Sequence, residues 1–144
     1  MTTGERSDPY LNFRFLVEIN GVINGGFSEV SGLQAETEIE EIREGGVNDF
    51  VHKLPKITKY PNFTLKKGIT DSEGLWKWHQ DVINGKIERK SGSIMLMDSE
   101  GNVKWRWNFS EAYPVKWAGP DLKADSSTVA VETVEIAHNG IKKV

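Results

Sequence analysis

The stretch Val103-Lys104-Trp105-Arg106-Trp107-Asn108-Phe109 alternates between apolar and polar side chains. Successive side chains of a β-strand point to opposite faces of a sheet, so this period of two predicts a half-buried strand. A helix would instead repeat its apolar residues every three or four positions. The stretch therefore predicts a strand whose buried face is aromatic.

The same alternation recurs on both sides of this stretch, at 13–19 and at 129–138. In the first segment Leu16 interrupts an otherwise polar face. Shorter strands are expected at 35–42, 62–66 and 93–98. The residues 98–102, Asp-Ser-Glu-Gly-Asn, separate two expected strands and should close a hairpin. The apolar face of segment 13–19 consists of Phe13, Phe15, Val17 and Ile19. The apolar face of segment 129–138 consists of Ala130, Val134 and Ile136.

One helix is expected at about 72–83. Thr70 followed by Glu73 has the spacing of a capping box, and Asp71 adds an acid near the positive end of the helix. Asn84-Gly85 supplies the stop. The expected apolar face consists of Leu75, Trp76, His79, Val82 and Ile83.

Length and composition describe a single globular domain over residues 1–144, with 38% hydrophobic and 27% charged residues. The fold class expected is mostly β: a small antiparallel barrel or sandwich with one flanking α-helix. The chain has no cysteine, which excludes disulfides and thiolate metal sites. A net charge of -3 argues against a dedicated nucleic-acid binder. The polar start of the sequence predicts no signal peptide, and no run of apolar residues reaches transmembrane length.

No catalytic or cofactor-binding motif is present in the sequence. His52, His79 and His138 lie far apart, and none has the spacing of an HExxH metal site. There is no GxSxG nucleophile elbow and no phosphate-binding glycine loop; the glycines of 21–26 follow a strand into a turn. We therefore expect no enzyme, no metal and no cofactor.

Two features are candidates for function. Glu36, Glu38 and Glu40 occupy alternate positions of an expected strand, so their carboxylates should share one face. The segment from Arg43 to Pro61 lacks periodicity, and we expect it to be a long loop, a kind of segment that is usually functional or disordered. Lysines gather in and after this loop near Tyr60 and Phe63, which suits either a solvated or subunit-pairing surface or, less well, single-stranded nucleic acid. These lysines are Lys53, Lys56, Lys59, Lys66 and Lys67.

A series of short motifs, in order, resembles the tail tube family of contractile phage tails, and within it the inner tube proteins of extracellular contractile injection systems. The resemblance covers nearly the whole chain. The motifs begin with DPYLNFRF at 8–15, FSEVSGL at 27–33, NFTLKKG at 62–68 and LWKW at 75–78. They continue with WNF at 107–109, AYPVKW at 112–117, DSS at 125–127 and ETVEIAH at 132–138.

The resemblance implies a structural subunit that forms hexameric rings, closed into a larger barrel and stacked into a hollow tube. It implies a surrounding sheath, baseplate and terminator proteins, and a protein cargo or tape measure in the lumen, with no membrane contact at rest. Such a subunit assembles in the cytoplasm and becomes part of an extracellular or virion-like particle. Two alternatives remain open: the tail tube of a DNA-carrying phage, where nucleic acid would be a partner, and a stand-alone β-barrel module that binds a ligand in an apolar pocket.

If the chain assembles into a tube, two expectations follow about which residues are functional. The face of Glu36, Glu38 and Glu40 should line the lumen, because a wall along which cargo slides must be polar. The loop from Arg43 to Pro61 should contact neighbouring subunits, because its apolar side chains are costly to leave in water together. The residues expected to make these contacts are Phe50, Val51, Lys53, Leu54 and Lys56.

Overall fold

The structure is a computed structural model that describes residues 14–43, 51–125 and 127–144. Within these ranges it contains ten strands and one helix, which confirms the mostly β class. The first strands are β1 (Arg14–Ile19), β2 (Ile23–Asn24), β3 (Phe27–Ser31), β4 (Glu36–Ile42), β5 (His52–Lys59) and β6 (Phe63–Gly68). They are followed by α1 (Gly74–Ile83), β7 (Lys90–Met97), β8 (Val103–Ala118), β9 (Val131–Ala137) and β10 (Ile141–Lys143).

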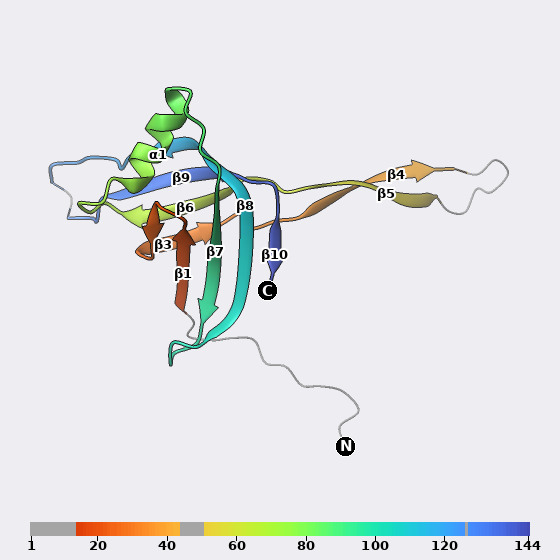
Figure 1. The fold of residues 1–144 in the computed structure, drawn as a ribbon, viewed down its shortest axis with the longest axis horizontal. Coiled ribbons are helices and arrows are strands. Elements are labelled where there is room, and N and C mark those ends of the chain that lie inside the picture. Colours follow the sequence, from red (N-terminus) through yellow and green to blue (C-terminus); the bar gives the residue numbers. More distant parts are fainter. Residues whose placement is uncertain (1–13, 44–50, 126) are drawn as a thin grey trace, which may run out of the picture.

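The strands form two crossing layers that share β8 (Figure 1). The β7 sheet has the order β2-β1-β7-β8-β10, and the β9 sheet has the order β8-β9-β6-β3. Residues of β8 up to Ala112 pair with β7, and residues from Tyr113 onward pair with β9. The bend between the two halves contains Glu111, which has a positive φ of 54°. The register with β7 shifts at this point, so Glu111 lies in a β-bulge. The sequence predicted the first half of β8 but not that one strand serves both layers.

The core lies where the two layers face each other. Phe63 of β6 meets Phe109 of β8 edge to face, with ring centroids 5.1 Å apart. The alternation in the predicted strands is confirmed, because Val17 and Ile19 of β1 and Val134 and Ile136 of β9 are all buried. Burial of such side chains is the dominant favourable contribution to folding.

The helix α1 covers one end of this core, but it begins two residues later than predicted. The capping box does not form: Glu73 stands at the N-cap without a side-chain cap, and Thr70 Oγ1 instead accepts a hydrogen bond from the Ser72 amide at 3.2 Å. Leu75 and Trp78 are the buried side chains of α1. The predicted apolar face was partly wrong, because Trp76 and Ile83 are exposed whereas His79 and Val82 are half-buried.

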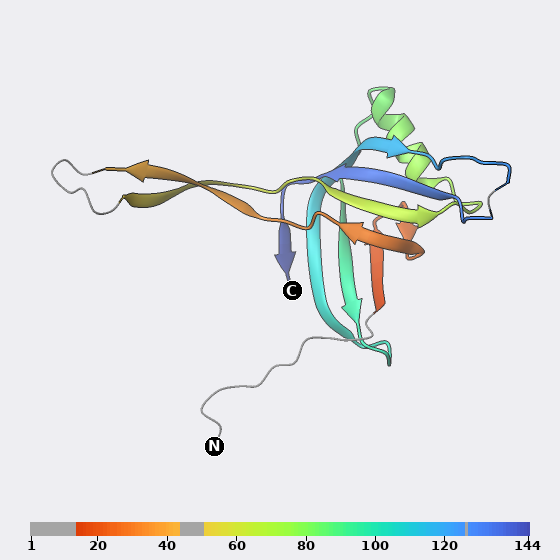
Figure 2. The ribbon, with the colours of Figure 1, turned by 180° about the vertical axis from the view of Figure 1, so that it is seen from behind.

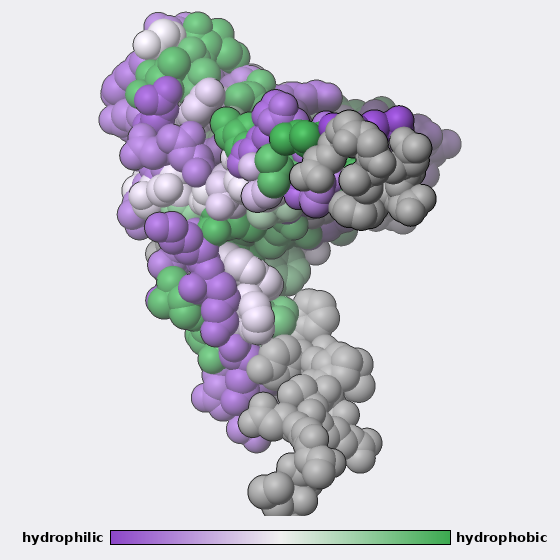
Figure 3. All heavy atoms as spheres, turned by 90° about the vertical axis from the view of Figure 1, so that its right-hand side faces the viewer, coloured by the Kyte–Doolittle hydropathy of each residue, from purple (hydrophilic) through white to green (hydrophobic). Residues whose placement is uncertain are grey.

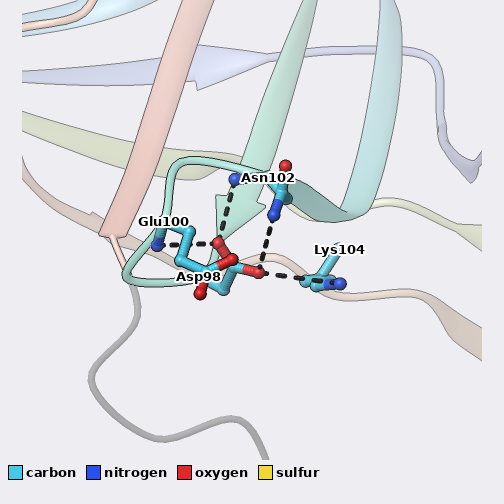
Figure 4. Close-up of polar contacts among 4 residues, drawn as sticks. All are labelled: Asp98, Glu100, Asn102 and Lys104. Carbon is cyan, nitrogen blue, oxygen red and sulfur yellow. Dashed lines mark hydrogen bonds and ion pairs between the residues drawn. The ribbon is translucent and has the colours of Figure 1, made fainter.

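The predicted hairpin at 98–102 is confirmed, and its turn is held by one side chain (Figure 4). Asp98 Oδ1 accepts hydrogen bonds from the backbone amides of Glu100 and Asn102, both at 2.9 Å. Lys104 Nζ lies 3.6 Å from the same carboxylate. The amide of Asn102 is the main reason that the pKa of Asp98 is lowered from its usual value.

Candidate assembly surfaces

The segment from Arg43 to Pro61 is not the long loop that its sequence predicted. Its second half is β5, which pairs with β4 in a two-stranded hairpin that extends away from both sheets (Figures 1 and 2). We call β4 and β5 the arm. Neither strand pairs with any other described strand. An isolated hairpin is marginally stable in water, so an arm of this kind needs a surface to pack against.

Both faces of the arm carry apolar side chains in water. Directly opposed residues share a face, so Ile39 lies beside Pro55 on one face and Leu54 beside Glu40 on the other. Between Thr37 and Ile39 the register shifts, which places two residues of β5 against the single residue Glu38. Ile39, Leu54 and Ile57 are 52%, 46% and 60% exposed.

The predicted site residues divide over the arm as follows. Val51 is half-buried just before β5, Lys53, Leu54 and Lys56 are exposed on β5, and Phe50 lies outside the described residues. Glu36 and Glu40 are exposed on β4. Glu38 forms an ion pair with Lys59, whose pKa is raised mainly by the hydrogen bond to that carboxylate. The three carboxylates are therefore not equivalent, because one of them is neutralised across the hairpin.

The predicted lysine cluster is also divided. Lys66 points outward and pairs with Glu29 at 3.1 Å, but Lys67 is only 4% exposed. Lys67 lies directly across from the buried Glu132, and its ammonium donates to Thr70 Oγ1 at 3.1 Å. Burial raises the pKa of Glu132, and the positive charge of Lys67 offsets part of that rise. The alternation Phe63, Leu65, Lys67 is the sequence signal that could have placed Lys67 inside.

The buried His138 is structural. Its Nδ1 accepts the amide of Gly140 at 3.1 Å, so the proton lies on Nε2, which donates to the carbonyl of Pro61 at 3.0 Å. Among the described residues there is no cluster of His, Cys, Asp or Glu that could hold a metal. A hollow of about 610 Å³ over β7, β8 and β10 is open and contains many Ser and Asn side chains, unlike the apolar pocket of a ligand-binding module.

The β9 sheet has two free edges. β3 pairs only with β6, and residues 113–118 of β8 pair only with β9 among the strands described. All neighbours in this sheet are antiparallel, so β3 of one copy beside residues 113–118 of a second copy would continue the same alternation of directions. Such edges invite pairing with another chain.

The outward side of the β9 sheet is polar and mostly small. Thr64, Thr133 and Ala118 alternate there with Lys116 and Glu135 around a shallow hollow. No helix in the described part of the chain is long and apolar enough to cross a membrane. A wall of hydroxyls and balanced charges gives passing molecules little apolar surface to which they can adhere.

These surfaces define a building block: a closed core, two unpaired sheet edges and a projecting arm. The chain belongs to the family of the T4-like virus tail tube protein gp19, whose family model matches residues 11–142. This is a family of structural proteins, so the chain is a tail tube protein and not an enzyme. No curated protein sequence matches this chain.

Solved structures agree with the family. The chain is similar to one in the six-fold symmetrised cryo-EM structure of the anti-feeding prophage baseplate, with 26% identity, a TM-score of 0.86, and coverage of 96% of this chain and 97% of that one. A chain of the sheath-tube complex of an extracellular contractile injection system, PVC, is 27% identical with a TM-score of 0.84, covering 94% and 91%. Hcp1 from Flavobacterium johnsoniae, at 20% identity, a TM-score of 0.60 and coverage of 90% and 93%, shares the fold alone.

Proposed function

We propose that this chain forms the inner tube of an extracellular contractile injection system, as hexameric rings that stack around a lumen. The observation that supports this most is the arm, which is exposed on both faces in the single chain and has no described strand beside it. The similarity to chains of baseplate and sheath-tube structures favours this setting over others. By the same similarity we propose a sheath, a baseplate and a tube terminator as partners, with protein cargo or a tape measure inside.

We propose that the ring closes by strand addition between β3 of one copy and residues 113–118 of the next. A head-to-tail contact of this kind generates a ring when the rotation closes. Closure would satisfy the free amides and carbonyls at both edges and remove the edges themselves. The result would be one continuous barrel to which every subunit contributes the four strands of its β9 sheet.

The lumen position of Glu36, Glu38 and Glu40 stays a proposal. The exposure of Glu36 and Glu40 and their polar character support it. Leu54 beside Glu40 and the pairing of Glu38 with Lys59 make this face less polar and less charged than a sliding wall requires. The outward side of the β9 sheet is a second candidate wall. To distinguish these two candidate walls, a cysteine is introduced at Glu40 or at Thr133, and intact tubes are labelled with a bulky maleimide and with a small one. A cysteine that faces the lumen should react only with the small reagent.

Electron microscopy of purified particles and of the isolated protein tests the proposal. Rings or tubes with a central channel are the expected result, and a monomer at every concentration and within particles would contradict the proposal.

The family match to a virus tail tube protein keeps a DNA-carrying phage tail as the second candidate function. Nuclease-protected DNA in purified particles would favour the phage tail, whereas DNA-free particles favour the injection system.

A further inference from the structure

We propose that α1 of one copy packs against an uncovered row of apolar side chains on the β7 sheet of the neighbouring copy. This rests on the proposed ring closure through β3 and residues 113–118, and it names a second pair of surfaces that the closure brings together. The row crosses three strands next to the hairpin turn at 98–102. It consists of Phe15 on β1, Leu96 on β7 and Trp105 on β8, which lie directly opposite one another in the register. We call it the rim row.

The β7 sheet is longer than the layer that covers its inward face. In the row that contacts β6, Ile19 and Phe109 are only 1% and 2% exposed. Two residues further along the strands, Val17 and Ile94 are still buried. In the rim row Trp105 is 38% exposed, and the other two side chains are half-buried. Cover is therefore lost progressively toward the turn, although the side chains stay large and apolar.

The helix α1 has an exposed apolar stripe that its own core does not use. Trp76 and Ile83 lie seven residues apart, about two helical turns, so they share one face of the helix. They are 43% and 61% exposed, whereas Leu75 and Trp78 are buried on the face that packs in the core. Seen along the arm, apolar surface lies at the top of the molecule, where α1 is, and again lower down over the β7 sheet (Figure 3). A helix that is apolar on two faces is typical of one that is covered from two sides.

α1 and the β7 sheet cover the same face of the β9 sheet. Trp117, on the free edge formed by β8, lies directly opposite Val134, which is fully buried, so both point to the inward face. Trp76 of α1 contacts Trp117 edge to face, with ring centroids 4.7 Å apart. Further across the sheet, the β7 sheet contacts the same face at Phe63 of β6. One edge of the inward face therefore carries α1, and the part toward β3 carries the β7 sheet.

The β7 sheet projects past β3, at the edge opposite α1. In Figures 1 and 2, α1 and the end of β8 lie at the top, β3 is the lowest strand of the β9 sheet, and β7 continues below it to the turn. Strand addition would place residues 113–118 of the next copy beside β3, and the α1 that lies over them would then face the projecting rim row. The rim row lies four residues beyond the row of Phe109, about 13 Å, and a helix about 10 Å wide fits into that length. The occupant is therefore a second copy, and the contact is head-to-tail, as closure of a ring requires.

A cation at the end of the rim row favours an indole as its partner. The ammonium of Lys143 lies 4.8 Å from the centre of the Trp105 ring, and the Lys143 side chain is exposed. Cations are attracted to the faces of aromatic rings, and to tryptophan most strongly. Trp76, at one end of the α1 stripe, supplies such a ring from the neighbouring copy.

Cross-linking tests the contact directly, because the natural chain has no cysteine to interfere. Ile83→Cys is combined with Leu96→Cys, and intact rings or particles from producing cells are treated with a short bis-maleimide. We expect a ladder of covalent oligomers on denaturing gels. The matched control combines Ile83→Cys with Thr133→Cys, on the outward side of the β9 sheet, and should give monomer. Intact rings that yield no Ile83–Leu96 ladder would overturn the inference while leaving the tube function standing.

Charge substitution gives an independent test. Ile83→Glu should raise the protein concentration at which half of the chains assemble by about tenfold or more, because one buried aliphatic contact is worth more than about 1.4 kcal/mol. Its circular dichroism should stay that of the natural protein, since Ile83 is 61% exposed in the single chain. Leu96→Lys added to Ile83→Glu should restore part of the assembly, because the two charges would then face each other. Unchanged assembly of Ile83→Glu would refute the contact. If the unsubstituted protein itself forms neither rings nor tubes in particles, the proposed function fails, and that outcome is distinct from the others.

Discussion

Gly92 of β7 lies beneath the ring of Phe109 on the neighbouring strand β8, so closely that a β-carbon at position 92 would overlap both that ring and the carbonyl of Glu18. The same ring meets Phe63 of the opposite sheet edge to face. One absent side chain thus lets an aromatic ring settle between the two layers, which explains a glycine in the middle of a strand.

Gly92→Ala should therefore destabilise the monomer by about 1–3 kcal/mol or more, because the ring and the backbone must both move. Chemical denaturation followed by tryptophan fluorescence measures this. Gly68→Ala is the matched control, since its β-carbon would lie at an ordinary 3.8 Å from Val129 Cγ1. Equal stability of the two variants would show that β7 and β8 can separate without cost.

Phe109→Ala should lower the free energy of unfolding by about 3–5 kcal/mol, because it removes a fully buried ring and leaves a cavity between the layers. Phe63→Ala should cost a similar amount, and the double variant less than the sum, since the two rings contact each other. Val129→Ala, at a residue 79% exposed, provides the baseline and should change stability by less than about 0.5 kcal/mol. Strictly additive losses would mean that the edge-to-face contact itself contributes nothing.

How far the sequence predicts this fold depends on whether a strand buries one face. β1, the first half of β8, and β9 each alternate because one side packs in the core, and all three were predicted. β5 does not alternate because both of its faces are exposed, so no burial imposes a period on its sequence. Pro55 indicated a break, yet an unpaired hairpin edge tolerates a residue without an amide hydrogen. The two free edges of the β9 sheet depend on which strands lack neighbours, and that is fixed by tertiary pairing alone.

The buried Glu132 should make stability depend on pH in a way that glutamine cannot. Its pKa is raised in the folded chain by burial, so the folded state holds the proton more tightly than the unfolded state does. Stability is then lost as pH rises from the unfolded pKa, about 4.3, through the higher folded pKa. The stability of Glu132→Gln relative to the natural protein should therefore increase over that window and level off above it.

Denaturation at a series of pH values measures this difference. Lys67→Met is the informative companion, because the ammonium of Lys67 opposes the rise of the Glu132 pKa. Without that charge, the loss of stability with rising pH should be larger than in the natural protein. A difference between Glu132→Gln and the natural protein that stays constant with pH would mean that folding does not shift the pKa of this carboxylate.

Asp98 should act in the opposite direction. Its pKa is lowered chiefly by the amide of Asn102, so its contribution to stability is present above the unfolded pKa of about 3.9 and lost as pH falls through the lower folded pKa. Asp98→Ala should therefore be less stable than the natural protein at neutral pH, and the gap should close in acid. Glu100→Ala, which keeps the backbone amide that Asp98 accepts, is the control and should show no gap.

Removing the arm should separate folding from assembly. The strands β4 and β5 pair only with each other among the described strands, and the ends of the arm lie close together, where Glu36 opposes Lys59. Replacing residues 36–59 by a short Gly-Ser linker should thus leave the core that contains Phe63 and Phe109 intact. We expect a soluble monomer whose free energy of unfolding stays within about 0.5 kcal/mol of that of the full chain, as for changes away from a core.

Size-exclusion chromatography with light scattering should show no rings of the armless chain at concentrations where the full chain assembles. A control that only replaces the tip, residues 44–50, by the same linker keeps β4 and β5 and should retain assembly if the strands, and not the tip, make the contact. Rings formed by the armless chain would mean that the free edges of the β9 sheet suffice for closure, and would leave the arm without a part in it.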